Sequence, residues 1–329
     1  MWFEKLTGFT EKSPENVRQN IIVEGQDLVL LSNGQKLRFG KLEIPTLEQL
    51  RANSLDEYNN TIQVEEIVAD VAKLHCASEN RNALFQVASQ FNLLEMINPN
   101  ITPEQGIDRY EYDFTQGPIC AIACGAGTIY RNYFAEVNGE IGQSKDNQID
   151  CLDLISKEFN NAQLNLWEMK NGYALVSKNG LQEIDQKIAQ LNEKEREILK
   201  GKLKIGLQWD SEVTISDTKH CVSQAYCSAL PVAYTNIAPN YWQSFARIVL
   251  EASYEATFYA AVLNFERNKS NLLYLTLIGG GAFGNESEWI LDAIKKAIRK
   301  FNKVPLNIKI VSYGQSNPKI QELIKELKN

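Results

Sequence analysis

A run of glycines near the C-terminal end is the clearest candidate for chemistry in this sequence. Gly279-Gly280-Gly281-Ala282-Phe283-Gly284-Asn285 follows the apolar run 272–278 and precedes a helical pattern that begins near Glu286. Glycine has no Cβ atom, so backbone N–H groups can turn toward an anion. The positive end of the helix that follows adds attraction. The order of strand, glycine loop and helix therefore predicts a cradle for a phosphorylated ligand.

The same stretch also has a purely structural interpretation, because glycine-rich turns often serve only to pack a helix on a sheet. Two known phosphate loops are excluded. No Gly-Lys-Ser or Gly-Lys-Thr follows the glycines, so this is not a Walker-type loop. No acidic residue ends a second strand about 20 positions later, so the fingerprint of nicotinamide dinucleotides fits poorly.

Composition narrows the class of protein. The chain has 329 residues, 44% of them hydrophobic and 23% charged, with a net charge of −7. This balance argues against a general nucleic-acid surface, which needs a basic face. No apolar run reaches the roughly 18 residues of a membrane span, and the N-terminus lacks the order of a signal peptide. Six scattered cysteines without a Cys-x-x-Cys pair favour a cytoplasmic protein with reduced thiols, no metal and no cofactor.

Several elements must position the glycine run. Residues 1–60 are predicted to form an N-terminal extension or accessory region, with a hairpin around Asn33-Gly34. Residues 61–329 are predicted to form the main domain, interrupted at about 155–202 by an exposed hairpin and an amphipathic helix. Lys178-Asn179-Gly180 is interpreted as part of that hairpin.

Strands and helices alternate through the main domain. Residues 83–89 are predicted to form a buried strand, followed by a long loop and a helix over 119–133. The alternation continues to the C-terminus and predicts an α/β fold, a three-layer α/β/α sandwich around a mixed sheet. A long loop inside such a domain is usually functional.

The order of these motifs resembles that of a macrodomain, the ADP-ribose-binding fold that also includes poly(ADP-ribose) glycohydrolase. Ala69-Asp70-Val71 is similar to the acid motif that holds adenine, and Thr115-Gln116-Gly117-Pro118 to the first phosphate loop. The glycine run matches the second phosphate loop. Val87-Ala88-Ser89-Gln90 replaces the family's Asn-Ala-Ala-Asn, and the Gln-Glu-Glu signature of the glycohydrolases is absent. The chain thus resembles a divergent, glycohydrolase-like member.

The resemblance implies a set of ligand-binding residues. They lie on the two loops, at the acid motif and at the end of the strand 83–89: Asp70, Ser89, Gln90, Asn92, Thr115, Gln116, Gly117, Gly279, Gly280, Gly281, Ala282, Phe283, Gly284 and Asn285.

The resemblance also implies cleavage of an ADP-ribosyl bond. Such a bond breaks through an oxocarbenium-like state that a nearby carboxylate assists. The loop 93–114 is rich in acids, and the catalytic candidates, in order of preference, are Asp113, Glu104, Glu95 and Asp108. The predicted function is therefore a hydrolase that removes ADP-ribose from a modified protein or cleaves poly(ADP-ribose).

Two alternatives stay open: a non-catalytic reader of ADP-ribose, and a regulator that binds a nucleotide or sugar phosphate. The expected partner is ADP-ribose or an ADP-ribosylated protein, which includes the option of ubiquitin, with no nucleic acid and no membrane. The chain is expected to be a monomer.

Overall fold

A seven-stranded mixed sheet forms the centre of the protein in this computed structural model, which describes residues 1–53 and 58–328. The strands run in the order β4 (Lys41–Glu43), β11 (Gly206–Glu212), β12 (Cys221–Cys227), β6 (Leu84–Ala88), β13 (Leu272–Leu275), β14 (Asn307–Ser312) and β5 (Gln63–Val68). The five strands from β12 to β5 are parallel, whereas β11 is antiparallel to both of its neighbours. The predicted mixed sheet is confirmed.

Strand β6 shows why the sheet is covered on both faces. Its first four residues are all buried, which is typical of a parallel strand between two helical layers. Phe85 stacks on His75 of α4 (Val71–Cys76), with ring centroids 3.8 Å apart. The next residue, Gln86, points the other way and donates from Nε2 to Thr257 Oγ1 of α11 (Gln243–Asn268) at 2.8 Å.

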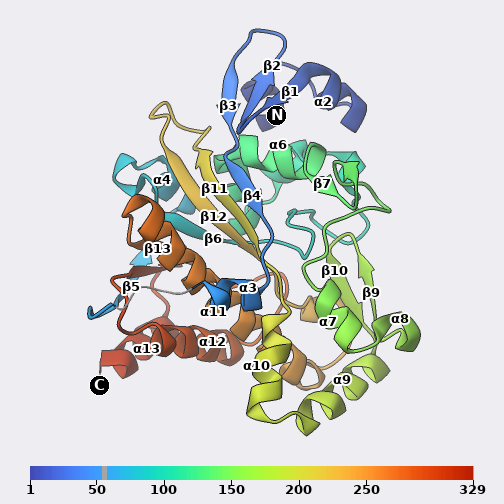
Figure 1. Ribbon diagram of the computed structural model, residues 1–329, viewed down its shortest axis with the longest axis vertical. Coiled ribbons are helices and arrows are strands. Elements are labelled where there is room, and N and C mark those ends of the chain that lie inside the picture. The colour runs from blue at the N-terminus through green and yellow to red at the C-terminus, as the bar shows by residue number, and fades with distance from the viewer. Residues whose placement is uncertain (54–57, 329) are drawn as a thin grey trace.

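The helices accordingly form two layers. One contains α4, α5 (Gln116–Ala123) and α6 (Gly125–Tyr133), and the other contains α11 and α12 (Ser287–Lys300), with α3 (Leu47–Ala52) and α13 (Pro318–Lys328) beside them (Figure 1). The predicted three-layer α/β/α sandwich is confirmed. No helix within residues 1–53 and 58–328 is both long enough and apolar enough to span a bilayer.

The helix predicted over 119–133 is in fact two helices. Cys124 leaves helical geometry, with φ −114° and ψ 58°, and separates α5 from α6. The backbone N–H of Gly125 donates to Thr214 Oγ1 at 3.0 Å instead of to a helical carbonyl. A side chain from a distant segment thus stabilises the break.

The N-terminal residues form a small unit at one end of the molecule. It contains α1 (Trp2–Thr7), α2 (Pro14–Asn20) and a three-stranded antiparallel sheet of β1 (Ile21–Glu24), β2 (Asp27–Leu30) and β3 (Lys36–Arg38). Pairing of β2 with β3 confirms the predicted hairpin. The same region also supplies β4 to the edge of the main sheet. The proposed domain boundary between residues 60 and 61 comes just after residues 54–57, which lie outside the described residues.

The insertion gathers at the opposite end of the molecule (Figure 1). It contains α7 (Asp153–Glu158), α8 (Asn161–Leu164), the hairpin of β9 (Trp167–Lys170) and β10 (Tyr173–Val176), then α9 (Lys178–Gln190) and α10 (Glu193–Gly201). The placement of Lys178-Asn179-Gly180 in the hairpin was wrong. Ser177 caps α9 by accepting from Gly180 N at 2.9 Å, and the hairpin turn is Asn171-Gly172. Asn192 and Glu195 form a capping box that divides the predicted helix in two.

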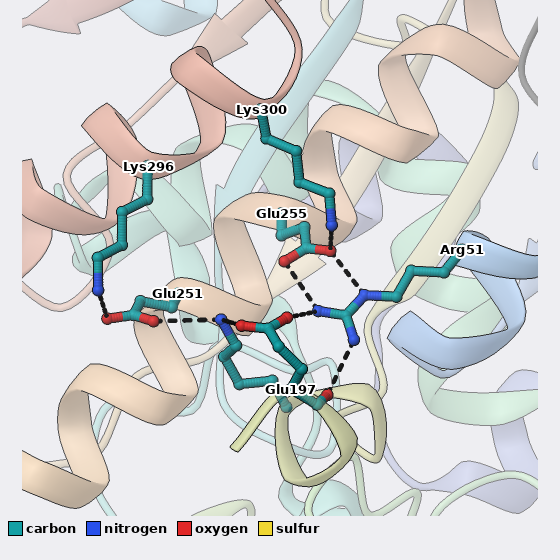
Figure 2. A network of polar contacts seen from close by, with 7 residues as sticks. Arg51, Glu197, Glu251, Glu255, Lys296 and Lys300 are labelled. Atoms are coloured by element: carbon teal, nitrogen blue, oxygen red, sulfur yellow. Dashed lines mark hydrogen bonds and ion pairs between the residues drawn. The ribbon is translucent and has the colours of Figure 1, made fainter. Parts of the chain in front are cut away.

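A network of ion pairs links α10 of the insertion to the main domain through Arg51 of α3 (Figure 2). Arg51 of α3 contacts Glu255 of α11 at 2.6 Å and Glu197 of α10 at 2.5 Å. Lys300 of α12 contacts Glu255 at 2.5 Å. Solvent screens partly buried ion pairs less than exposed ones, so this network stabilises the attachment of α10 more than exposed pairs would.

The core of the main domain contains a neutral histidine. His75 is fully buried, donates from Nδ1 to Val71 O at 2.8 Å and accepts from Gln224 Nε2 at 3.1 Å. Burial lowers the pKa of His75 from 6.5 to about 4, because the charged ring would lose its hydration.

We expect this histidine to make folding sensitive to acid. Between pH 6.5 and 4 the unfolded chain binds a proton at His75 that the folded protein does not, so stability falls as the pH falls. His75→Phe keeps a ring on Phe85 but orphans one N–H of Gln224, a cost of about 1–3 kcal/mol at pH 7. Urea unfolding should show the gap between the two proteins narrowing toward pH 4. A gap that is constant with pH would contradict the neutral assignment.

Candidate functional site

A cavity of about 380 Å³ opens where the parallel strands β12, β6 and β13 end. Ala88, Ala229 and Thr276 mark the three strand ends in its lining. Ligands of open α/β sheets bind at this edge, because loops diverge there. The lining includes eleven of the residues predicted from sequence: Ser89, Gln90, Glu95, Asp113, Thr115, Gln116, Gly117, Gly279, Gly281, Ala282 and Phe283.

Backbone conformation and close packing require glycine at two positions of the loop. Gly279 has φ +72° and Gly284 has φ +68°, a region in which only glycine is unstrained. A Cβ on Gly279 would lie 2.5 Å from Ala229 Cβ. Tyr254 holds the start of the loop, since its hydroxyl donates to Thr276 O at 2.7 Å and accepts from Ile278 N at 2.9 Å.

Four backbone N–H groups of this loop have no acceptor among the described residues: those of Gly279, Gly281, Ala282 and Phe283. The other N–H groups are used within the loop, as in the bond from Asn285 N to Gly279 O at 2.9 Å. Successive free N–H groups at a cavity wall form a concave donor site for an anion. These N–H groups are therefore available to the predicted anion cradle, which stays a prediction.

Helix α12, which follows the glycine loop, contributes less to the anion site than the sequence predicted. Glu286 occupies the N-cap of α12 and Glu288 its first turn, so acidic side chains stand at its positive end. No residue of α12 belongs to the described cavity lining. Asn285 also turns away, because its Nδ2 donates to Leu230 O at 2.8 Å. Gly280 and Gly284 shape the loop without lining the cavity.

A second set of free donors stands at the start of α5. The N–H groups of Gln116 and Gly117 have no acceptor among the described residues, as is usual in a first helical turn. The Gln116 side chain is already engaged, since Oε1 accepts from Ala88 N at 2.9 Å and Nε2 donates to Gln86 O at 2.8 Å. The Gln116 amide thus fixes α5 on the end of β6, and only its backbone remains for a ligand.

Gly117 makes this close seating of α5 possible. A Cβ at this position would lie 2.0 Å from Ala88 O and 3.1 Å from Glu95 Cγ. No other residue fits between the helix and the strand. The first turn of α5 therefore packs directly on Glu95.

Three aromatic rings form one wall of the cavity. The ring centroid of Phe283 lies 5.3 Å from that of Tyr173 and 5.5 Å from that of Tyr234. The centroids of the two tyrosine rings are 5.1 Å apart. Tyr173 comes from the insertion and donates to Met96 O at 2.5 Å. Sequence analysis missed both tyrosines. The continuous apolar run after the Asn171-Gly172 turn was the available signal for Tyr173.

Glu95 is the most unusual acid of the lining. It is 2% exposed, and neither carboxyl oxygen has a hydrogen-bond partner among the described residues. Burial raises the pKa of Glu95 to about 8. The positive charge of Arg131 and the nearby Tyr110 hydroxyl oppose this rise in part, and the negative charge of Asp113 reinforces it. The carboxyl is therefore mostly protonated at neutral pH and can donate a proton.

Arg131 is the nearby cation whose charge favours the ionised form of Glu95. It is fully buried, donates from Nε to Leu93 O at 3.1 Å and stacks its guanidinium on the Tyr226 ring, 3.7 Å from the centroid. The backbone N–H of Glu95 itself donates to Tyr110 Oη at 2.9 Å. These bonds hold the backbone at Leu93 and at Glu95.

Asp113 is the second acid of the lining and is half-buried. Its Oδ1 accepts from Thr115 N at 2.9 Å and from Thr115 Oγ1 at 2.7 Å, which places the carboxylate beside the first turn of α5. Its second oxygen has no protein partner among the described residues. The cavity therefore holds two carboxyl groups in different surroundings.

The other two predicted acids do not line the cavity. Glu104 accepts from Lys145 N at 2.7 Å, and Asp108 accepts from Phe3 N at 3.3 Å. Glu11 holds the same segment by accepting from the backbone N–H groups of Ile107 and Asp108 at 2.8–3.1 Å. Asp108 and Glu11 thus fix the acidic loop and the N-terminal segment on each other, whereas Glu104 fixes the loop to Lys145.

Three further candidates serve the backbone. Asp70 caps α4 by accepting from Ala72 N at 2.8 Å and lies outside the described lining. Asn92 is fully buried and accepts from Leu94 N at 3.1 Å. Gln90 lines the cavity, but its Oε1 accepts from Met96 N at 2.8 Å.

Ser89 also lines the cavity, with its hydroxyl donating to Gln90 O at 3.1 Å. Across residues 1–53 and 58–328, no three His, Cys, Asp or Glu side chains gather as a metal site requires.

Gly117 offers a direct check of the packing described above. We expect Gly117→Ala to lower the thermal unfolding temperature, at a cost of about 1–3 kcal/mol, because the methyl group collides with backbone. Gly281→Ala is the matched control in the other loop, since nothing lies within 4 Å of its Cβ position. Equal unfolding temperatures for the two variants would rule out the close seating of α5.

Glu95 should make the protein less stable as the pH rises. The unfolded chain releases this proton near pH 4.5 and the folded protein only near pH 8, so stability falls across that window. Glu95→Gln cannot ionise and should exceed the natural protein in stability at pH 9 by a few kcal/mol, with little difference at pH 4.5. Guanidinium unfolding at both pH values measures this, and parallel pH profiles would contradict a protonated Glu95.

Comparisons with known proteins give structural likeness only. No protein-family model matches the sequence, and no curated protein matches it. Among solved structures, poly(ADP-ribose) glycohydrolase from Deinococcus radiodurans in complex with ADP-ribose aligns with 10% identity and a TM-score of 0.43, covering 87% of this chain and 94% of that one. The Thermomonospora curvata enzyme, bound to the inhibitor ADP-HPD, aligns with 9% identity and a TM-score of 0.41, covering 95% of each chain. Such weak likeness assigns no family, and the resemblance to macrodomains stays a prediction.

Proposed function

We propose that this protein binds an ADP-ribosyl group in the cavity and hydrolyses the bond between its ribose and the group that carries it. The observation that supports this most is Glu95, a buried acid that keeps its proton at neutral pH inside a cavity lined by free backbone donors. A protonated acid without hydrogen-bond partners contributes little to stability. It is well suited to protonate a leaving group.

The donors suit a diphosphate. One set belongs to the glycine loop 279–283 and the other to the first turn of α5, so two phosphates can each meet backbone N–H groups. The aromatic wall of Tyr173, Tyr234 and Phe283 offers a flat apolar surface to a sugar. A cavity of about 380 Å³ is within the range of small-molecule sites, roughly 300–1,000 Å³.

The two acids divide the reaction between them. Glu95 gives its proton to the leaving atom as the bond from that atom to the anomeric carbon breaks. Asp113 takes a proton from the water whose oxygen forms the new bond to that carbon, and it stabilises the positive charge that develops on the sugar. Exchange with solvent returns the proton from Asp113 to Glu95. The products are free ADP-ribose and the protonated carrier.

Two measurements separate the three candidate functions, which are a hydrolase, a reader of ADP-ribose and a phosphate-binding regulator. Calorimetry with ADP-ribose, AMP and NAD tests the ligand, and preference for ADP-ribose supports the proposal. Release of ADP-ribose from modified proteins and from the polymer then separates a hydrolase from a reader, which binds without turnover. A phosphate-binding regulator would bind AMP or another phosphate at least as well as ADP-ribose.

We expect substitutions of Glu95 and Asp113 to affect turnover in different ways. Glu95→Gln should lower kcat by about 10²–10⁴-fold and remove an alkaline limb near pH 8 from the rate profile. Asp113→Asn should reduce turnover while leaving the affinity for ADP-ribose largely intact. Glu104→Gln, outside the lining, is the matched control and should retain activity. Unchanged turnover in Asp113→Asn would remove Asp113 from the mechanism.

A further inference from the structure

The mouth of the cavity has an apolar rim. Ile97, Tyr112 and Phe114 all border it, and they are 57%, 62% and 85% exposed. Phe114 is the most exposed large apolar side chain among the described residues. Isolated exposed apolar residues are common, but three around one opening are typical of an interaction site.

The rim is attached to a well-held backbone. Tyr112 ends the 3-10 helix η3 (Asp108–Tyr112), which begins where Glu11 accepts from Asp108 N at 2.8 Å. Phe114 lies between Asp113 and Thr115, which are hydrogen-bonded to each other at 2.9 Å. Ile97 follows Met96, whose backbone N–H donates to Gln90 at 2.8 Å. Exposed side chains on ordered backbone lose less entropy on binding than those on a mobile loop.

The charges at the cavity discriminate between two kinds of carrier. The described lining contains the acids Glu95 and Asp113 and no lysine or arginine. Every further unit of an ADP-ribose polymer would bring a charged diphosphate to this mouth, where no cation of the lining receives it. A polyanion needs such cations for affinity. An apolar protein surface needs only the exposed rings and Ile97.

We infer that the rim of Ile97, Tyr112 and Phe114 docks the apolar surface of a protein that carries a single ADP-ribose, and that the enzyme favours this substrate over the polymer. The inference rests on the proposed function. The ADP-ribose enters the cavity, while the carrier side chain and its apolar neighbours lie against the rim.

The test uses peptides that carry one ADP-ribose on serine, arginine or glutamate. Each peptide is made in two forms, with leucines or with glycines beside the modified residue. Poly(ADP-ribose) and a nitrophenyl glycoside of ADP-ribose are the comparison substrates. The variant is Ile97→Ser/Phe114→Ser, and Tyr313→Ser is the control, because Tyr313 is 83% exposed and lies outside the described lining.

The natural protein should hydrolyse a leucine-flanked peptide with kcat/KM about tenfold above that of its glycine-flanked form and above that of the polymer. The double variant should lose this preference through KM, while its rate on the nitrophenyl glycoside changes by less than about twofold. Tyr313→Ser should behave like the natural protein.

Three outcomes overturn the inference: faster cleavage of the polymer, no preference for leucine in the natural protein, or an equal loss on the nitrophenyl glycoside. The last would place the rim within the ADP-ribose site itself. If the natural protein neither binds ADP-ribose nor cleaves any of these substrates, the proposed function fails, and the docking inference fails with it.

Discussion

The separation of β6 from β13 is the constraint on which the site depends. These neighbours pair only at Leu84 with Leu273 and at Phe85 with Tyr274, and then they diverge. Divergence would orphan the backbone groups of Gln86 and Ala88, which is costly inside a protein. The Gln116 amide meets both of them, so the break in the sheet itself fixes the helix that brings free donors and Asp113 to the cavity.

Glu95 shows how this packing sets chemistry. The seating of α5 through Gly117 covers Glu95, and coverage holds its proton to a higher pH. The burial of Glu95 therefore lowers the free energy of unfolding near neutral pH, where a protonated acid can serve as a proton donor. Strain and unpaired groups of this kind concentrate at functional sites, because elsewhere selection has no reason to keep them.

Sequence patterns predicted the structural elements that depend on local residue type. The glycine loop, the turn before α5 and the buried strand β6 were foreseen, because glycine, proline and apolar runs act over a few residues. Ranking the acids was harder, since Asp108 and Glu104 differ from Glu95 in burial and partners rather than in local sequence. Tyr173 and Tyr234 belong to segments that only the tertiary fold brings together. The antiparallel placement of β4 and β11 likewise depends on long-range pairing.

The aromatic wall has a consequence for how the protein is made. Tyr173, Tyr234 and Phe283 meet across more than a hundred positions of sequence, and Glu95 lies farther back still. Contacts of such long range form late in folding, after the entropy of closing the loops has been met. During synthesis, Glu95 is therefore made long before the glycine loop. The cavity is complete only after the glycine loop has been made. Any catalytic capacity would appear only in the finished molecule, so partly folded chains would be inert toward their substrate.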